Sequence, residues 1–168
     1  RLSGLKRAHG AKVFGMQSSR QSVEVSENQS NLVLVVDDSR LQRSILRTSL
    51  KKWGYRIAEA ASGGEALAFC ETTQPDLVIS DWMMPGMDGI EFCRHFKALE
   101  AERFGYFILL TSKSDKSEIA QGLDAGADDF LTKPFSAAEL RARLVAGERI
   151  LDMERELTRK NELIKSTL

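Results

Sequence analysis

Short apolar segments alternate with longer amphipathic segments along the chain from Asn31 onward. The apolar segments are rich in β-branched and aromatic residues, and they cover residues 31–36, 55–60, 77–80, 106–110 and 130–132. In the amphipathic segments apolar residues recur at helical spacing, which predicts helices over residues 39–54, 63–73, 90–99 and 116–125 and a last helix from Ser136. Because parallel strands need crossover connections, the pattern predicts a parallel sheet covered by helices on both faces.

Side chains able to do chemistry follow four of the predicted strands. Asp37 and Asp38 follow the first strand, Asp81 follows the third, Thr111 the fourth and Lys133 the fifth. In an open parallel sheet ligands bind outside the carboxyl ends of the strands. These residues are therefore candidates for a functional site on their position alone.

Taken alone, some of these residues also have an ordinary structural explanation. Asp81 could cap the following helix or shape its turn, and Lys133, which precedes Pro134, could be a solvated loop residue. Three carboxylates at neighbouring strand ends are harder to explain, because crowded like charges raise one another's pKa and are costly without a cation. Since an all-oxygen cluster suits a hard divalent ion such as Mg²⁺, the residue types favour a metal site.

The order and spacing of these motifs resemble the receiver domain of two-component response regulators. The motifs are Asp37-Asp38, Asp81 with Met84-Pro85-Gly86-Met87-Asp88-Gly89, Thr111, and Lys133-Pro134-Phe135. The resemblance extends over residues 31–147, which we expect to form the receiver domain. It implies an α/β, flavodoxin-like, doubly wound fold with a five-stranded parallel sheet of strand order 2-1-3-4-5 and helices on both faces. With that order the three acids meet at the topological switch point.

The resemblance also implies a role in phosphoryl transfer. Asp81 would accept a phosphoryl group from a partner histidine kinase or phosphotransfer protein, since a carboxylate can act as a nucleophile and form an acyl-phosphate. Mg²⁺ would be held by Asp38, Asp81 and the backbone carbonyl of Met83. Asp37 would support the ion through water. The domain would be regulatory and not itself an enzyme.

Two further residues would stabilise the phosphoryl group and respond to it. Lys133 would supply a positive charge to one phosphoryl oxygen, and Thr111 would supply a hydroxyl donor to another. By resemblance, Thr111 would then move inward and the aromatic residue Phe130 would rotate into the space vacated. Phe130 stands where the family often has tyrosine, so we expect a stronger preference for the buried position. The alternative is that Phe130 is plain core.

Two positions are expected to set the lifetime of the phosphorylated form. Met83, two residues after Asp81, and Lys113, two residues after Thr111, correspond to side chains that frame the attacking water in the family. Because an apolar methionine cannot orient that water, we expect slow self-dephosphorylation.

The last predicted helix continues well beyond the expected receiver domain, with no proline after Pro134. An approximate heptad seam, interrupted by Lys160, is formed by Ile150, Met153, Leu157, Ile164 and Leu168. We therefore expect residues 148–168 to be a coiled-coil linker that joins a homodimer and leads to an output domain. The alternative is a solvated helix extension without a partner.

The segment 144–163 is similar to the signalling helices that join receivers to catalytic outputs. GGDEF-type diguanylate cyclases and PPM-type phosphatases are two such outputs, and the segment leans toward the phosphatase. Neither catalytic domain nor a DNA-binding helix-turn-helix is visible in the sequence. We interpret the chain as a regulatory fragment.

Composition narrows the remaining functional classes. The chain has 168 residues, of which 42% are hydrophobic, which suits one packed domain with appendages. Its formal net charge is +0, so there is no basic excess of the kind that nucleic-acid binding requires. Its apolar runs fall short of the roughly 18 residues of a membrane span. Cys70 and Cys93 show no metal or disulfide spacing and fit a reducing compartment, so we expect a cytoplasmic protein.

Residues 1–30 differ in composition from the rest of the chain. They combine scattered basic residues with Gly, Ser and Gln and show no sustained amphipathic period, so we expect a flexible arm. Because the chain begins with Arg1 and Met16 opens a more polar segment, our hypothesis is that residues 1–15 are a non-native addition. A phosphate-donating histidine is not expected, since His9 lies in this arm and His95 lies in a helical pattern.

Two other functions compete with the phosphoacceptor interpretation. A scaffold that binds partners without phosphorylation is possible for this fold, but the complete set of site residues argues against it. A Mg²⁺-dependent hydrolase of the haloacid dehalogenase type also uses an aspartate nucleophile. Those enzymes need a second acid two residues later, where this chain has Met83.

Overall fold

The computed structural model describes residues 31–99, 104–112 and 116–167. They contain a five-stranded parallel sheet in the order β2-β1-β3-β4-β5, which confirms the predicted flavodoxin-like topology. The strands are β1 (Leu32–Val36), β2 (Arg56–Ala60), β3 (Leu77–Asp81), β4 (Tyr106–Thr111) and β5 (Asp129–Thr132). The expected N-terminal arm and Leu168 of the expected heptad seam lie outside the described residues.

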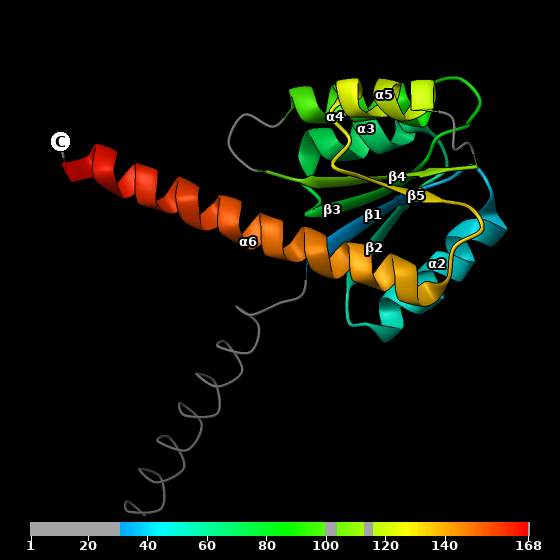
Figure 1. Cartoon of the computed structure of the whole chain (residues 1–168), viewed down its shortest axis with the longest axis horizontal. Coiled ribbons are helices and arrows are strands. Elements are labelled where there is room, and N and C mark those ends of the chain that lie inside the picture. The colour runs from blue at the N-terminus through cyan, green and yellow to red at the C-terminus, as the bar shows by residue number, and fades with distance from the viewer. Residues whose placement is uncertain (1–30, 100–103, 113–115, 168) are drawn as a thin grey trace, which may run out of the picture. The chain divides into compact units, whose positions relative to one another are not determined.

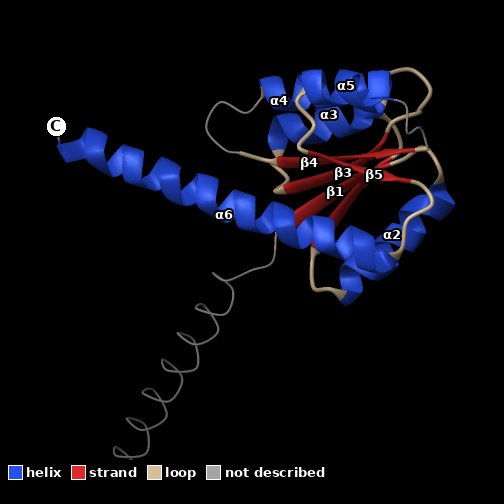
Figure 2. Cartoon of the chain, viewed as in Figure 1, coloured by secondary structure: helices blue, strands red, loops and turns tan. Residues whose placement is uncertain are grey.

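Helices cover both faces of this sheet. The helices are α2 (Arg40–Lys52), α3 (Gly63–Thr72), α4 (Gly89–Ala98), α5 (Lys116–Ala125) and α6 (Ala137–Thr167). Figure 1 shows α3, α4 and α5 on one face and α2 and α6 on the other. In Figure 2 the strands, drawn in red, lie between these two layers of helices.

The strands are apolar along their whole length because each face of the sheet is covered. In β1, Val33 and Val35 pack beneath α2 and α6, whereas Leu34 and Val36 pack beneath α3 and α4. All four side chains are at most 1% exposed. A strand buried on both sides has no polar face, which explains the continuous apolar runs in the sequence.

Local signals fix the ends of the helices where the sequence predicted them. The hydroxyl of Ser39 accepts a hydrogen bond from the backbone N–H of Gln42 and caps α2. Gly54, just beyond the end of α2, has φ +88°, a conformation that glycine adopts without strain. The hydroxyl of Ser136 accepts a hydrogen bond from the backbone N–H of Glu139 at the start of α6.

A stripe of buried residues fixes α6 to the sheet. The stripe consists of Leu140, Leu144, Gly147 and Leu151. The backbone of α6 approaches β4 closely at Gly147, where an added Cβ would lie 2.6 Å from Cδ2 of Tyr106. Glycine therefore allows the helix to pack directly on the tyrosine ring.

The buried stripe of α6 ends at an ion pair. The guanidinium of Arg155 pairs with the carboxylate of Asp76. The second carboxylate oxygen of Asp76 accepts a hydrogen bond of 2.6 Å from the backbone N–H of Leu32. Asp76 precedes β3, so this contact lies at the amino ends of the strands. It ties α6 to the edge of the sheet opposite the predicted acids.

Beyond Arg155 the helix runs past the sheet (Figure 1). The 31 residues of α6 give it a length of about 46 Å, as the unbroken sequence pattern predicted. Met153, Leu157 and Ile164 are 70%, 56% and 57% exposed. No helix in the described part of the chain has both the length and the apolar character that crossing a membrane requires.

We predict that Gly147→Ala destabilises the fold by about 1–3 kcal/mol, because the new methyl group would collide with the ring of Tyr106 and push α6 away from the sheet. Gly64→Ala in α3 is the matched control, because no atom lies within 4 Å of its added Cβ. The control should be neutral or stabilising by up to about 1 kcal/mol. Urea unfolding measures both changes. Equal stability of the two variants would contradict the close packing of α6.

Candidate functional site

The three acids predicted from the sequence meet at one edge of the sheet. The pairing of Val36 in β1 with Ser80 in β3 brings the next residues, Asp37 and Asp81, to the same edge. One carboxylate oxygen from each of Asp37, Asp38 and Asp81 lies within 4.8 Å of those of the other two. Parallel pairing of two strands that each end in acid therefore builds the cluster.

Asp37 is the buried member of the cluster, with 2% of its surface exposed. Burial raises the pKa of its carboxyl above the ordinary value, and the neighbouring charges of Asp81 and Asp38 raise it further. The hydrogen bond of 2.9 Å from the backbone N–H of Ser39 and the positive charge of Lys133 oppose this increase. The fold thus holds Asp37 where its negative charge is costly.

Asp81 is partly buried and has two donors on one oxygen. Its Oδ1 accepts a hydrogen bond of 2.9 Å from the backbone N–H of Trp82 and lies 3.1 Å from Nζ of Lys133. Its backbone carbonyl accepts a hydrogen bond of 3.0 Å from the hydroxyl of Ser80. These contacts fix the orientation of the carboxylate at the end of β3.

Lys133 and Thr111 come to the same edge from the adjacent strands. The backbone N–H of Lys133 donates a hydrogen bond of 2.8 Å to the carbonyl of Thr111, which ties the end of β5 to the end of β4. Thr111 is 2% exposed. The Lys133–Pro134 peptide bond is cis. The predicted hydroxyl and amine are therefore both at the carboxyl edge of the sheet, and the amine contacts Asp81.

The remaining predicted residues have different positions. The side chain of Met83 is 57% exposed beside the site. Phe130 is half-buried in β5, and its ring lies over Gly122 of α5, where an added Cβ would be 2.5 Å from its Cζ. Lys113 lies outside the described residues. The packing places Phe130 against the core.

The structure adds three residues to the site that the sequence did not identify. The backbone N–H of Trp82 binds the Asp81 carboxylate, and an added Cβ on Gly89 would collide with the Asp81 carbonyl. Arg43 of α2 donates a hydrogen bond of 2.6 Å to the backbone carbonyl of Asp37. In the sequence, Gly89 was visible only as the last residue of the motif that follows Asp81. Arg43 was visible only as an arginine six residues after Asp37.

The donor set fits a hard divalent cation. Three carboxylates supply oxygen ligands, and Lys133 balances only part of their charge. Oxygen-only sites of this kind suit Mg²⁺ and similar ions. A bound cation would also compensate the charge of the buried Asp37.

Residues 33–145 match the response regulator receiver domain family, and the chain belongs to this family. The chain is 42% identical over 114 residues to the phosphate regulon transcriptional regulatory protein PhoB of Pseudomonas aeruginosa, covering 68% of this chain and 50% of that protein. It is 43% identical over 115 residues to the alkaline phosphatase synthesis transcriptional regulatory protein PhoP of Bacillus subtilis, covering 68% of this chain and 47% of that protein. The chain thus spans about half the length of these curated relatives.

Solved structures show the same fold. The chemotaxis protein CheY4 of Vibrio cholerae superposes with a TM-score of 0.66 at 33% identity, covering 70% of this chain and 98% of CheY4. A two-component system response regulator/GGDEF domain protein superposes with a TM-score of 0.69 at 34% identity. That match covers 76% of this chain and 52% of the other. The chain is therefore a receiver domain with a long C-terminal helix.

We predict that Asp37→Asn stabilises the metal-free protein near neutral pH. The folded state raises the pKa of Asp37, so ionisation costs stability as pH rises from the ordinary aspartate pKa through the folded value. Asparagine removes this cost and can still accept the hydrogen bond from Ser39. The gain should shrink as pH falls toward 4. Urea unfolding in EDTA at several pH values measures it, and a variant less stable than the native chain at neutral pH would contradict it.

Proposed function

We propose that this receiver domain takes a phosphoryl group onto Asp81 from a histidine kinase or phosphotransfer protein. One observation carries the proposal: the Asp81 carboxylate is held at the end of β3 by the Trp82 amide and the Lys133 amine, beside two further acids. This arrangement fixes a nucleophile next to a cation and a metal-binding group. Membership of the receiver family supports the same chemistry.

Each residue of the site then has a role. Asp38, Asp81 and the backbone carbonyl of Met83 would hold Mg²⁺, and Asp37 would support the ion through water. When bound, the ion would supply positive charge to the oxygens of the incoming phosphoryl group. Lys133 neutralises another of these oxygens. Phosphoryl transfer needs mainly such positioning and charge, because little covalent chemistry is left to the protein.

The partner that donates the phosphoryl group packs on α2 in this account. The helix begins two residues after Asp38, and its side chains Leu41 and Ile45 are 67% and 53% exposed. Exposed apolar residues one turn apart beside the acceptor suit contact with a helix of the donor protein.

A cytoplasmic location is a further prediction. It is supported by this class of partner and by the two free cysteines.

The response to phosphorylation runs through Thr111 and Phe130. The Thr111 hydroxyl binds the phosphoryl group, and Phe130 repacks as the end of β4 moves inward. Support comes from the ring of Phe130, which lies on a glycine of α5 and is only half-buried. The ring therefore has a packing surface on α5 and some exposed surface that a more inward position would bury.

Met83 and Lys113 set the lifetime of the acyl-phosphate. The exposed, apolar side chain of Met83 stands beside the site and offers no group to orient an attacking water. We expect slow hydrolysis for this reason. The interpretation of Lys113 rests on the sequence alone.

We predict that incubation with phosphoramidate and Mg²⁺ adds one phosphoryl group to the native chain and none to Asp81→Asn, because the Asp81 carboxylate lies beside Lys133 and within the acidic cluster that would hold the metal. Asp88→Asn is the matched control, since Asp88 lies on the same connection but caps α4 through the N–H of Glu91. Intact-protein mass spectrometry measures the addition and its decay. Modification of Asp81→Asn, or loss of modification in Asp88→Asn, would contradict the assignment. Fast decay would contradict the role of Met83.

The part of α6 beyond the sheet joins two copies of the chain and carries the signal to an output domain. Its exposed apolar residues Met153, Leu157 and Ile164 follow the spacing of a coiled-coil seam. A GGDEF-type cyclase and a PPM-type phosphatase are the two candidate outputs. The superposition with a response regulator/GGDEF domain protein supports the cyclase. The sequence of segment 144–163 favours the phosphatase.

We predict that the native chain forms a dimer that Leu157→Lys weakens by at least tenfold, because the substitution would bring two charges together in the seam. Arg159→Lys on the same exposed part of α6 is the control and should leave association unchanged. Sedimentation equilibrium measures the dimer dissociation constant with and without beryllofluoride. A monomer under both conditions would contradict dimer formation through α6. It would leave the assignment of Asp81 as phosphoacceptor unchanged.

A further inference from the structure

A guanidinium in α2 supports the turn that carries two of the acids. We propose that Arg43 is a positioning residue for the metal site: it fixes the peptide between Asp37 and Asp38, and Glu59 of β2 holds it in place. The inference rests on the proposed Mg²⁺ site. It assigns a function to an ion-pair cluster outside the residues that would bind the ion.

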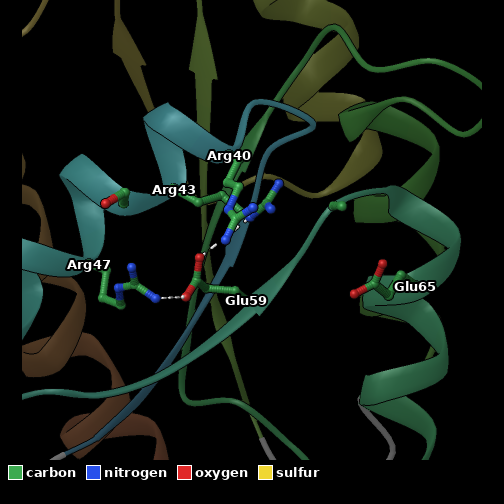
Figure 3. A pocket seen from close by; sticks show the side chains of 7 residues that line it. Arg40, Arg43, Arg47, Glu59 and Glu65 are labelled. Carbon is green, nitrogen blue, oxygen red and sulfur yellow. Dashed lines mark hydrogen bonds and ion pairs between the residues drawn. The ribbon is translucent and has the colours of Figure 1, made fainter.

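Arg43 makes two contacts with different parts of the fold. Its Nη1 group donates a hydrogen bond of 2.6 Å to the backbone carbonyl of Asp37, and its Nε lies 3.4 Å from Oε1 of Glu59. Its side chain is only 15% exposed. Figure 3 shows the guanidinium of Arg43 beside the carboxylate of Glu59. Both side chains line a polar cavity between α2, β2 and α3.

Glu59 binds a second arginine through its other oxygen. Oε2 of Glu59 accepts a hydrogen bond of 2.8 Å from Nη1 of Arg47 (Figure 3). The side chain of Arg47 is 51% exposed. Both arginines therefore tie α2 to β2 through the same carboxylate. Arg43 also contacts the acidic turn through the carbonyl of Asp37, so Arg47, whose described contact is to Glu59, serves as an internal comparison.

The carbonyl that Arg43 binds belongs to the peptide bond joining Asp37 to Asp38. The N–H of Asp37 already donates a hydrogen bond of 3.1 Å to the carbonyl of Ala60, and its side chain accepts one from Ser39. The contact with Arg43 adds a constraint on the next peptide plane, which sets the direction of the Asp38 side chain. A metal ligand at an exposed turn needs such a constraint, because outer contacts orient the ligands.

The effect of Arg43 on the site is mainly geometric. Glu59 shares one negative charge between Arg43 and Arg47, so the loss of either arginine removes the same positive charge near the site. The short contact is to a backbone carbonyl and not to a carboxylate of the cluster. Comparison of the two losses therefore isolates the effect of Arg43 on where Asp38 points.

The test measures Mg²⁺ affinity in Arg43→Gln, Arg43→Lys and Arg47→Gln. Trp82 adjoins Asp81, so its fluorescence can follow binding in a Trp53→Phe background, which removes the other tryptophan. We expect Arg43→Gln to weaken Mg²⁺ binding by about tenfold, the lower end of the usual cost of losing an outer contact. Arg47→Gln should stay within about twofold of the parent. Arg43→Lys should recover most of the affinity, because its ammonium can still donate to the Asp37 carbonyl.

Urea unfolding of the same proteins separates positioning from stability. Arg43→Gln loses the hydrogen bond to Asp37 as well as a contact to Glu59, so its midpoint should fall further than that of Arg47→Gln. Both variants should still be fully folded in the Mg²⁺ titration, where only Arg43→Gln loses affinity. Equal loss of affinity in both variants, or unchanged affinity in Arg43→Gln, would overturn the positioning role. A parent protein that does not bind Mg²⁺ would instead overturn the proposed metal site itself.

Discussion

The proposed function depends on three carboxylates that the sheet brings together at one edge. β1 and β3 are adjacent, and both end in acid, so their pairing places Asp37 and Asp38 beside Asp81. Among the described residues Lys133 contacts the cluster, and burial of Asp37 increases the cost of its charge. A bound cation would offset this cost, as the proposed function requires.

The acidic cluster and the exit of α6 lie at opposite edges of the same sheet. The acids follow the carboxyl ends of the strands, whereas the ion pair of Arg155 with Asp76 lies at the amino ends. Between them, α6 packs along the sheet through a buried stripe and touches β4 where Gly147 meets Tyr106. β4 also carries Thr111 at its other end. In the proposed function, a displacement of β4 by the phosphoryl group would therefore act directly on α6.

Much of this account could be predicted from the sequence, because its signals are local. Continuous apolar runs and strand-end acids predicted the strands and the convergence of Asp37 with Asp81, and the family resemblance supplied the strand order. Contacts between distant residues could not be predicted in this way. Arg155 and Asp76 are 79 positions apart, and Arg43 binds a backbone carbonyl, which has no signature in sequence. The supporting contacts of the site therefore became visible only in three dimensions.

The most direct test of the central claim is ¹⁹F NMR of the chain with beryllofluoride, which mimics an acyl-phosphate, with and without Mg²⁺. If Asp81 is the acceptor and the acids bind the ion, protein-bound fluorine signals will appear only with Mg²⁺ present. They will be absent from Asp81→Asn and retained in Asp88→Asn. Bound signals that persist in Asp81→Asn, or no bound signal in the native chain, would contradict the account.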